Sequence, residues 1–212
     1  MKRTKILKIF LVFAMTISLF HISNSTVDAA RPSCLTFEQN TWRWSGSYNR
    51  WFLCRNRSYQ RGWQFVNNHW YFLNPRFGDA RHRSNLPSGA MLDGWLLSYG
   101  RWYFLNPSTG NSGHTNALPH GAMRTGWITH NSHTYFLNPS TGMADLPHGA
   151  MATRWVFHST HGWRFLNPSS SSSSHTPGLP HGAMVANRTV RIDGQTCQFN
   201  ANGTNTNGCR RQ

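Results

Sequence analysis

A repeat of about thirty residues constrains this chain more than any other feature. Trp63, Trp95 and Trp127 are spaced by 32 residues, and Trp155 follows 28 residues later. Each copy opens near a Trp, runs through an aromatic segment that ends in Leu-Asn-Pro, and closes with Leu-Pro, one variable residue and Gly-Ala-Met. A fixed period of this length predicts a repeat architecture, in which stacked units bury apolar faces that no single unit can bury.

The repeats also predict how the chain divides. Four clear copies occupy residues 62–186, and a degenerate copy lies on each side. Residues 30–61 keep a Trp pair, Trp44 and Trp51, with the seven-residue spacing of the clear copies. Residues 187–212 keep a strand-turn-strand pattern without the Trp pair. Atypical end repeats are typical of caps, so we expect a cap at each end of the stack.

Each copy reads as a β-hairpin, because aromatic and β-branched residues flank a short turn. With a two-residue turn before Arg101, Trp95 lies opposite Phe104 and Trp102 opposite Leu97. Strand alternation then places the two tryptophans and the Phe on one face and the intervening tyrosine on the other. The fold class predicted is all-β, built from stacked hairpins.

The first 29 residues have the pattern of a secretory signal peptide. Basic residues between Lys2 and Lys8 precede an apolar run, Ile9–Phe20, and small residues follow at Val27–Ala29. The apolar run is short for a bilayer span, which favours a cleaved signal over an uncleaved anchor. We therefore expect an exported protein with no transmembrane segment after cleavage.

After residue 29 the permanent positive charges are all arginines, with no lysine. The mature part has 17 Arg and 5 acidic residues, a net charge of +12, and nine of the Arg fall between Arg31 and Arg83. Guanidinium groups bind phosphate in a bidentate manner, so a polyanion such as wall teichoic acid, an anionic membrane or nucleic acid is one interpretation. Export makes nucleic acid the least expected of these, and we predict no nucleic-acid partner. A solvated basic face is the alternative.

Four cysteines lie near the ends of the mature chain. Local disulfides Cys34–Cys54 and Cys197–Cys209 would staple the two caps, although four cysteines allow three pairings. A zinc site is disfavoured, since no two of them have a C-x-x-C spacing.

No pattern of catalytic residues is evident. The five mature acids are scattered, and the motifs of metalloproteases, serine hydrolases and P-loop enzymes are absent from the sequence. His120, His148 and His181 occupy equivalent positions and are expected to be turn residues, with a metal-binding ladder as the alternative. We expect no enzyme activity, no metal and no cofactor.

Aromatic residues make up 14% of the chain. They are expected to form part of the core, because small β units need large apolar side chains. A seam between stacked hairpins could also form an aromatic box open to solvent. Such a box suits a quaternary ammonium, since cation–π attraction contributes about 0.5–2 kcal/mol. The same rings could stack on sugars.

The pattern Gly-Trp, then Trp-Tyr-Phe-Leu, then Gly-Ala-Met resembles the choline-binding (cell-wall-binding) repeat of Gram-positive surface proteins and of phage or bacterial lysins. The resemblance covers essentially the whole mature chain. It implies a solenoid of β-hairpins with choline sites between consecutive hairpins, each built from two aromatics of one unit and one of the next, with a Met at the edge. It also implies attachment to phosphocholine on teichoic acids.

The resemblance assigns site residues seam by seam, with either the Tyr or the Phe after it as the third wall. The seams expected are Trp44 and Trp51 with Tyr71, Trp63 and Trp70 with Tyr103, Trp95 and Trp102 with Tyr135, Trp127 with the hairpin that follows, and Trp155 and Trp163 with a final hairpin that offers only Phe199; the edge residues are Met91, Met123, Met151 and Met184.

Two substitutions depart from the family pattern. Thr134 replaces the second Trp beside Trp127, which should weaken that seam, and Arg164 replaces Tyr at the seam after it. About three seams of five look competent. The repeat is also longer than the usual family repeat of about twenty residues.

Taken together, these observations predict a secreted, non-catalytic protein that binds choline or phosphocholine on wall or lipoteichoic acid and is held non-covalently at the cell wall. Arginine contacts to polymer phosphates would add to the attraction. The alternatives are a carbohydrate (glucan)-binding repeat module, since related repeats bind glucans, and a cationic secreted antimicrobial protein, suggested by the high positive charge.

Overall fold

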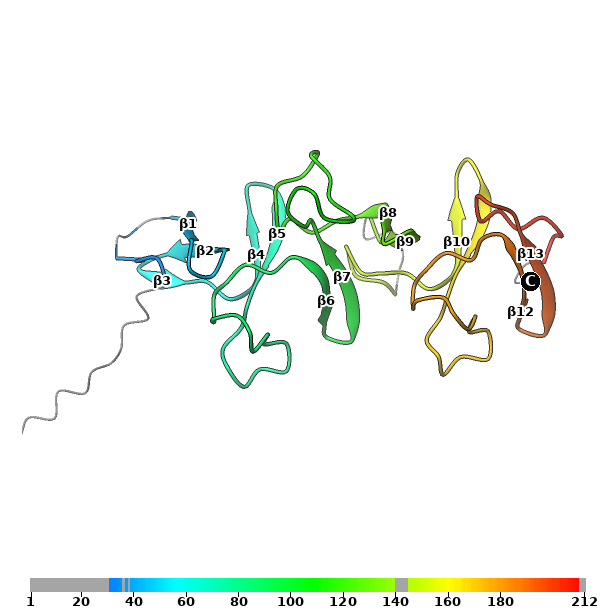
Figure 1. Ribbon diagram of the computed structural model, residues 1–212, viewed down its shortest axis with the longest axis horizontal. Coiled ribbons are helices and arrows are strands. Elements are labelled where there is room, and N and C mark those ends of the chain that lie inside the picture. Colours follow the sequence, from blue (N-terminus) through cyan, green and yellow to red (C-terminus); the bar gives the residue numbers. More distant parts are fainter. Residues whose placement is uncertain (1–30, 36, 38, 140–144, 210–212) are drawn as a thin grey trace, which may run out of the picture.

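The computed structural model describes residues 31–35, 37, 39–139 and 145–209, which form a row of six β-hairpins (Figure 1). The predicted signal peptide, residues 1–29, lies outside them. No helix capable of crossing a membrane is found in this described part. The strands are β1 (Thr41–Ser45), β2 (Arg50–Arg55), β3 (Ser58–Tyr59), β4 (Gly62–Val66), β5 (His69–Leu73), β6 (Gly94–Ser98), β7 (Arg101–Leu105), β8 (Gly126–His130), β9 (His133–Leu137), β10 (Arg154–His158), β11 (Gly162–Leu166), β12 (Arg188–Ile192) and β13 (Gln195–Phe199).

The turns explain why these segments form hairpins. Tyr99 and Gly100 both have positive φ, 48° and 71°, which is the geometry of a two-residue turn that matches strand twist. Asn67 and Asn68 have φ of 48° and 64° in the hairpin before it. Two hairpins differ: the β1–β2 turn has four residues, 46–49, and the β10–β11 turn has three, 159–161.

The predicted register is confirmed in the hairpin β6–β7. Trp95 pairs with Phe104, Leu97 with Trp102, and Leu96 with Tyr103. The two tryptophans therefore share one face of the hairpin, and Tyr103 lies on the other. The first four hairpins have aromatic residues on both faces, which lets them contact neighbours on either side, whereas β10–β11 and β12–β13 carry aromatic residues on one face only.

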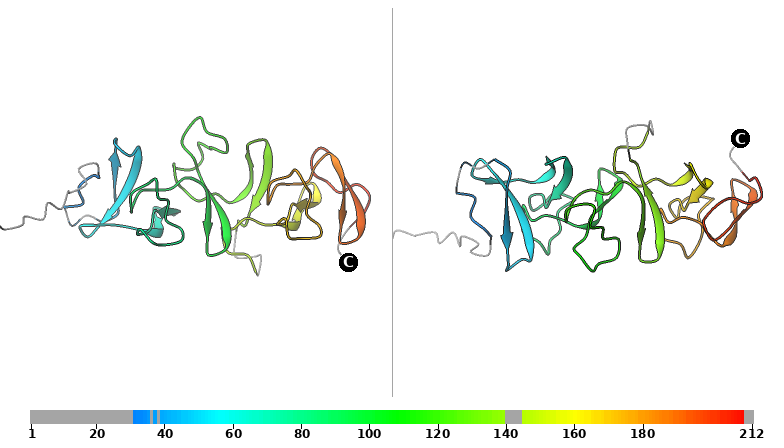
Figure 2. Two further views of the ribbon diagram at one scale, coloured as in Figure 1. Left: turned by 60° about the horizontal axis from the view of Figure 1, so that its bottom comes forward. Right: turned by 90° about the horizontal axis from the view of Figure 1, so that it is seen from above.

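The hairpins do not join into one sheet. Each forms its own two-stranded sheet, except that β3 adds a third strand to β1–β2. An isolated two-stranded hairpin is at best marginally stable in water, so the units depend on one another. Figure 2 shows the same elongated row from two further sides. The predicted all-β solenoid of stacked hairpins is thus confirmed.

Backbone hydrogen bonds at the methionines link successive hairpins. The N–H of Met91, which follows β5, donates to the carbonyl of Trp51 in β2 at 2.7 Å. Met91 also forms an isolated β-bridge with Leu73 of its own unit. The next three units repeat this pattern through Met123 to Trp70, Met151 to Trp102, and Met184 to Thr134.

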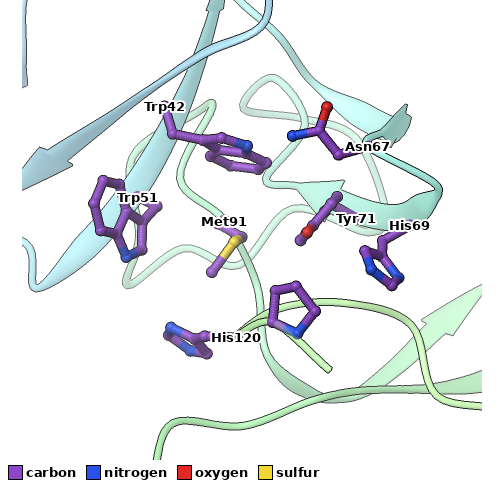
Figure 3. A pocket seen from close by; sticks show the side chains of 8 residues that line it. Trp42, Trp51, Asn67, His69, Tyr71, Met91 and His120 are labelled. Carbon is purple, nitrogen blue, oxygen red and sulfur yellow. The ribbon is translucent and has the colours of Figure 1, made fainter. Parts of the chain in front are cut away.

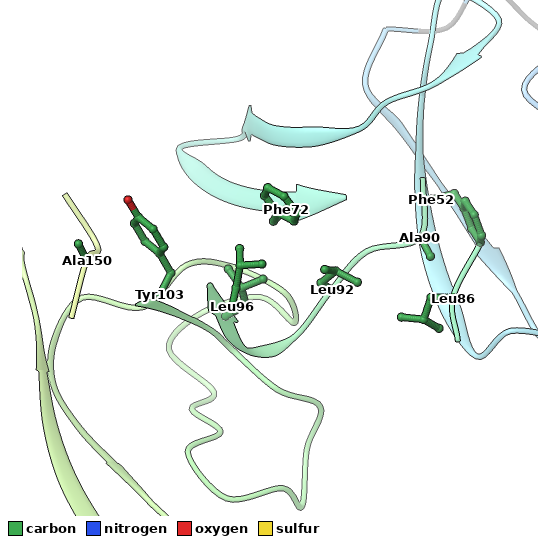
Figure 4. Packing of buried hydrophobic residues seen from close by; sticks show 9 residues of the cluster. Phe52, Phe72, Leu86, Ala90, Leu92, Leu96, Tyr103 and Ala150 are labelled. Atoms are coloured by element: carbon green, nitrogen blue, oxygen red, sulfur yellow. The ribbon is translucent and has the colours of Figure 1, made fainter. Parts of the chain in front are cut away.

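The core runs along the row and passes from unit to unit. One buried cluster draws residues from the first three hairpins and the connections around them (Figure 4). Three phenylalanines in equivalent strand positions are fully buried: Phe72, Phe104 and Phe165. Phe52 of β2 is also fully buried, on the opposite face of its hairpin.

The asparagine of each Leu-Asn-Pro segment folds the long connection that follows it. Asn106 is fully buried. Its amide donates to the carbonyls of Thr115 (3.0 Å), Leu118 (2.8 Å) and Pro119 (3.2 Å), and its carbonyl accepts from the Thr115 N–H (3.0 Å). Equivalent amide bonds are made by Asn74, Asn138 and Asn167. Burial of the loop backbone is tolerated because these groups are paired.

The predicted disulfides Cys34–Cys54 and Cys197–Cys209 are both present. Cys54 and Cys197 are buried in the first and last hairpins. The cross-links therefore hold the flanking segments against the two end units.

Replacing Asn106 with Ala should lower the free energy of unfolding by about 2 kcal/mol or more, since each buried polar group left without a partner costs about 1–3 kcal/mol. Urea denaturation followed by tryptophan fluorescence measures the change. Asn111→Ala is the matched control, because Asn111 lies exposed in the same connection and its side-chain amide donates to Ser108 of the same turn. Equal effects of the two variants would contradict this role for the buried amide.

Candidate functional site

The candidate sites are the seams between successive hairpins. We number them from the N-terminus: the first seam lies between β1–β2 and β4–β5, the second between β4–β5 and β6–β7, and the third between β6–β7 and β8–β9. The fourth lies between β8–β9 and β10–β11, and the fifth between β10–β11 and β12–β13.

The first seam holds a cavity of about 440 Å³ (Figure 3). Trp42 and Tyr71 meet across it with ring centroids 4.9 Å apart and planes at 63°. The side chains face a shared space, with the Met91 sulfur between the rings and His120 (Figure 3). The full lining is Trp42, Trp51, Asn67, His69, Tyr71, Met91, Pro119 and His120.

The third seam has the same design in a smaller cavity of about 240 Å³. Trp95 lies 6.3 Å from Trp102 with rings nearly perpendicular, at 88°, and 4.9 Å from Tyr135 at 69°. Met151 and the pair Pro180 and His181 complete the lining.

The second seam repeats this aromatic geometry. Trp63 lies 6.4 Å from Trp70 at 84° and 5.0 Å from Tyr103 at 66°. The Trp63 indole N–H donates to the Ser98 hydroxyl at 3.2 Å, which fixes the ring against the next hairpin. In all three seams the Tyr, rather than the following Phe, supplies the third wall.

The first seam corrects one predicted residue. We expected Trp44 and Trp51 to meet Tyr71, but the structure places Trp42 there instead. The four-residue turn at 46–49 is two residues longer than the turns of β4–β5 and β6–β7, so a seven-residue spacing no longer marks equivalent positions. Trp44 pairs directly with Trp51 across the hairpin and is 44% exposed.

The predicted edge methionines lie where the seams close. Met91 and Met151 line their cavities. A Cβ added to Gly121 would overlap the Met91 sulfur, and Gly121 has a φ of 80°. The glycine of the Gly-Ala-Met segment thus lets the next connection approach the methionine of the previous unit.

Sequence reasoning missed the Pro-His pair as part of the seam wall. His120 and His181 are in turns, as expected, yet each lines a cavity formed by hairpins earlier in the chain. The threefold repetition of Leu-Pro-His-Gly-Ala-Met was the available signal. It did not reveal that each connection reaches back over two units.

The fourth seam is occupied by the protein's own cation. Thr134 stands where the other seams have a second Trp, and the Arg164 guanidinium lies 4.8 Å from the centroid of the Trp127 ring. Arg164 is buried, and burial lowers its pKa from the ordinary value. We expected Arg164 to alter the fifth seam. The third wall of a seam comes from the hairpin that follows it, so Thr134 and Arg164 both belong to the fourth seam.

The fifth seam has a different arrangement. Phe199 lies 5.9 Å from Trp155, with planes at only 34°. Cys197, engaged in its disulfide, holds the strand position that Tyr occupies elsewhere. Trp163 packs 5.4 Å from Phe157 and is 37% exposed. This seam therefore lacks the three-sided aromatic wall of the first three.

The first three seams are suited to a small organic cation with apolar substituents. Several ring faces can attract a positive charge by cation–π interaction, worth about 0.5–2 kcal/mol where the site is desolvated. Burial raises the pKa of the wall tyrosines Tyr71, Tyr103 and Tyr135, so their hydroxyls stay neutral. The methionine side chain adds a polarizable apolar contact.

No group of three or more His, Cys, Asp or Glu side chains with the arrangement of a metal site is found among the described residues. The histidines at 120 and 181 serve instead as walls of apolar cavities.

Comparison with known proteins supports the repeat assignment. Residues 62–75 and 125–140 match a family described as "Putative cell wall binding repeat", the choline-binding type. No curated protein matches significantly.

Solved structures show the fold. Choline binding protein F from Streptococcus pneumoniae is 22% identical over 79% of this chain and 42% of its own, with a TM-score of 0.53. Other similar structures include CbpJ from Streptococcus pneumoniae (25% identity, 79% of this chain and 48% of that one, TM-score 0.36) and a pneumococcal cell wall endolysin of phage Cp-1 complexed with choline (22%, 85% and 39%, 0.41). This chain spans less than half the length of each of them. Two of the hairpin repeats thus match the choline-binding, cell-wall-binding type, and the described part of the chain is arranged as a solenoid of β-hairpins.

Proposed function

We propose that this protein binds choline, free or as phosphocholine on wall or lipoteichoic acid, in its first three seams. The observation that carries the proposal is the recurrence of one arrangement in these seams, two indoles and a neutral Tyr, with a cavity at the first and the third. Among the described residues, no arginine lies over the rings of these three seams as one does in the fourth. The fourth seam gives complementary support, because the Arg164 guanidinium there lies over the Trp127 ring, where the ammonium of a ligand would bind in an open seam.

We further propose that the protein is exported, non-catalytic and held at the cell wall by these contacts. In this account residues 62–186 are the binding repeats, and residues 30–61 and 187–212 are caps closed by disulfides. Several weak sites on one chain can engage neighbouring cholines of one polymer, and the effective concentration raises the overall affinity.

Trp102→Ala should remove one choline site of three, because Trp102 forms one wall of the third seam. Isothermal titration with choline measures the stoichiometry. Leu97→Ala is the matched control, since Leu97 pairs with Trp102 on the same hairpin and is 47% exposed. An unchanged number of sites in Trp102→Ala would contradict the proposal.

Opening the fourth seam should create a further site. The double variant Thr134→Trp and Arg164→Tyr restores the residue types of the other seams and removes the competing cation. We expect one additional choline per chain by the same titration. Thr129→Trp with Arg164 retained is the control and should add none. If the double variant folds and gains no site, the internal cation does not explain the closed seam.

Arginine contacts should make polymer binding depend on salt. The affinity for purified choline-substituted teichoic acid should fall as NaCl rises, because the screening length shrinks from about 10 Å at 0.1 M to about 3 Å at 1 M. The affinity for free choline, measured in parallel, should change much less. Equal salt dependence of the two would remove the arginines from the binding account.

A further inference from the structure

A second cavity adjoins the first seam. Its volume is about 480 Å³, and it opens at the tip of the hairpin β1–β2, against the connection that follows β7. Trp51 and His120 line both this cavity and the first seam, so the two cavities share a wall. We call it the tip pocket; its lining is Trp44, Asn49, Arg50, Trp51, Ser108 and His120.

Strand alternation supplies the aromatic side of this pocket. Trp44 lies two residues beyond the seam residue Trp42 on the same face of β1, and it pairs with Trp51 of β2. Trp44 lies 5.3 Å from Trp51 at 60° and is 44% exposed. A large apolar ring face is therefore available to a ligand beside the seam.

The opposite side of the pocket is polar and held in place by Asp93. The carboxylate accepts a hydrogen bond from His120 Nε2 at 2.9 Å, and its other oxygen lies 3.9 Å from Arg50 Nη2. Burial raises the pKa of Asp93, but the hydrogen bond from His120 and the charges of Arg50 and Arg83 outweigh it and leave the pKa below its ordinary value. Asp93 is thus ionised and orients both side chains.

This pairing decides the chemical class of ligand. Asp93 lies 3.9 Å from Arg50 and partly compensates its charge, so the rim offers oriented hydrogen-bond groups. Asn49 and Ser108 add further polar groups. A pocket with apolar ring faces and a few converging polar groups suits a ligand with one apolar face and several hydroxyls. A sugar ring has this character, whereas a simple anion or an alkyl chain does not.

We propose that the tip pocket binds the sugar ring to which phosphocholine is attached, while the ammonium occupies the first seam. The inference rests on the proposed function, because it requires the ammonium of the same ligand to lie in the first seam. Trp51 and His120 line both cavities, so one ligand can extend from the first seam into the tip pocket. The first seam then distinguishes choline on a glycan from free choline.

The equivalent position of the next hairpin provides a matched control. Phe65 pairs with Trp70 as Trp44 pairs with Trp51, with ring centroids 5.2 Å apart, and is 52% exposed. Phe65 does not line the tip pocket. Its removal deletes a comparable exposed ring without touching the proposed subsite.

The test uses the mature protein labelled with ¹⁵N at the tryptophan indoles. The Trp44 indole signal is identified by its loss in Trp44→Ala. Three probes are titrated: choline, phosphocholine, and methyl glucoside esterified with phosphocholine. We expect all three to shift the signals of the seam indoles, and only the glycoside to shift Trp44. The glycoside should bind the first seam roughly tenfold more tightly than phosphocholine, a gain that Trp44→Ala removes and Phe65→Ala keeps.

The outcomes separate the two levels of the account. If the seam indoles respond to choline but Trp44 ignores the glycoside, or if Trp44→Ala keeps the full gain in affinity, the tip pocket is not a sugar subsite and the proposed function stands. If no seam indole responds to choline, the proposed function fails, and this inference fails with it.

Discussion

One backbone hydrogen bond organises this protein: the N–H of each repeat methionine donates to a carbonyl in the hairpin before it. The distances are 2.7 Å for Met91 to Trp51 and 2.7 Å for Met151 to Trp102. The accepting residue is the second Trp of a seam, so the bond that stacks two units also fixes one wall of the candidate site. The methionine side chain then rests against the glycine of the following connection. The stacking contact and the candidate site therefore depend on the same residues.

The fourth seam shows that these roles can separate. Met184 donates to Thr134 at 2.7 Å, so the stacking bond persists where the Trp has been lost. The Arg164 guanidinium lies over the face of the Trp127 ring and makes a cation–π contact within the protein. A unit can thus give up ligand binding and still support the row. A ligand that bridges two hairpins should in turn stabilise the stack, since binding to the folded state alone shifts the unfolding equilibrium.

The sequence was informative wherever local rules decide the structure. Turn residues with positive φ, such as Tyr99 and Gly100, fix the register, and alternation then places Trp95 and Tyr103 on opposite faces. It failed where loop length mattered: a four-residue turn shifted the first seam from Trp44 to Trp42. It also missed the wall formed by His120, because no local pattern shows that a connection returns to a hairpin two units earlier.

The most direct test of the central claim is a crystal structure of the mature protein with choline bound. The account predicts an ammonium group against Trp42, Trp63 and Trp95, each enclosed with the Tyr of the next hairpin, and none against Trp127, where Arg164 lies. Choline bound elsewhere on the surface, with the three seams empty, would contradict it and leave the aromatic rings with a packing role alone.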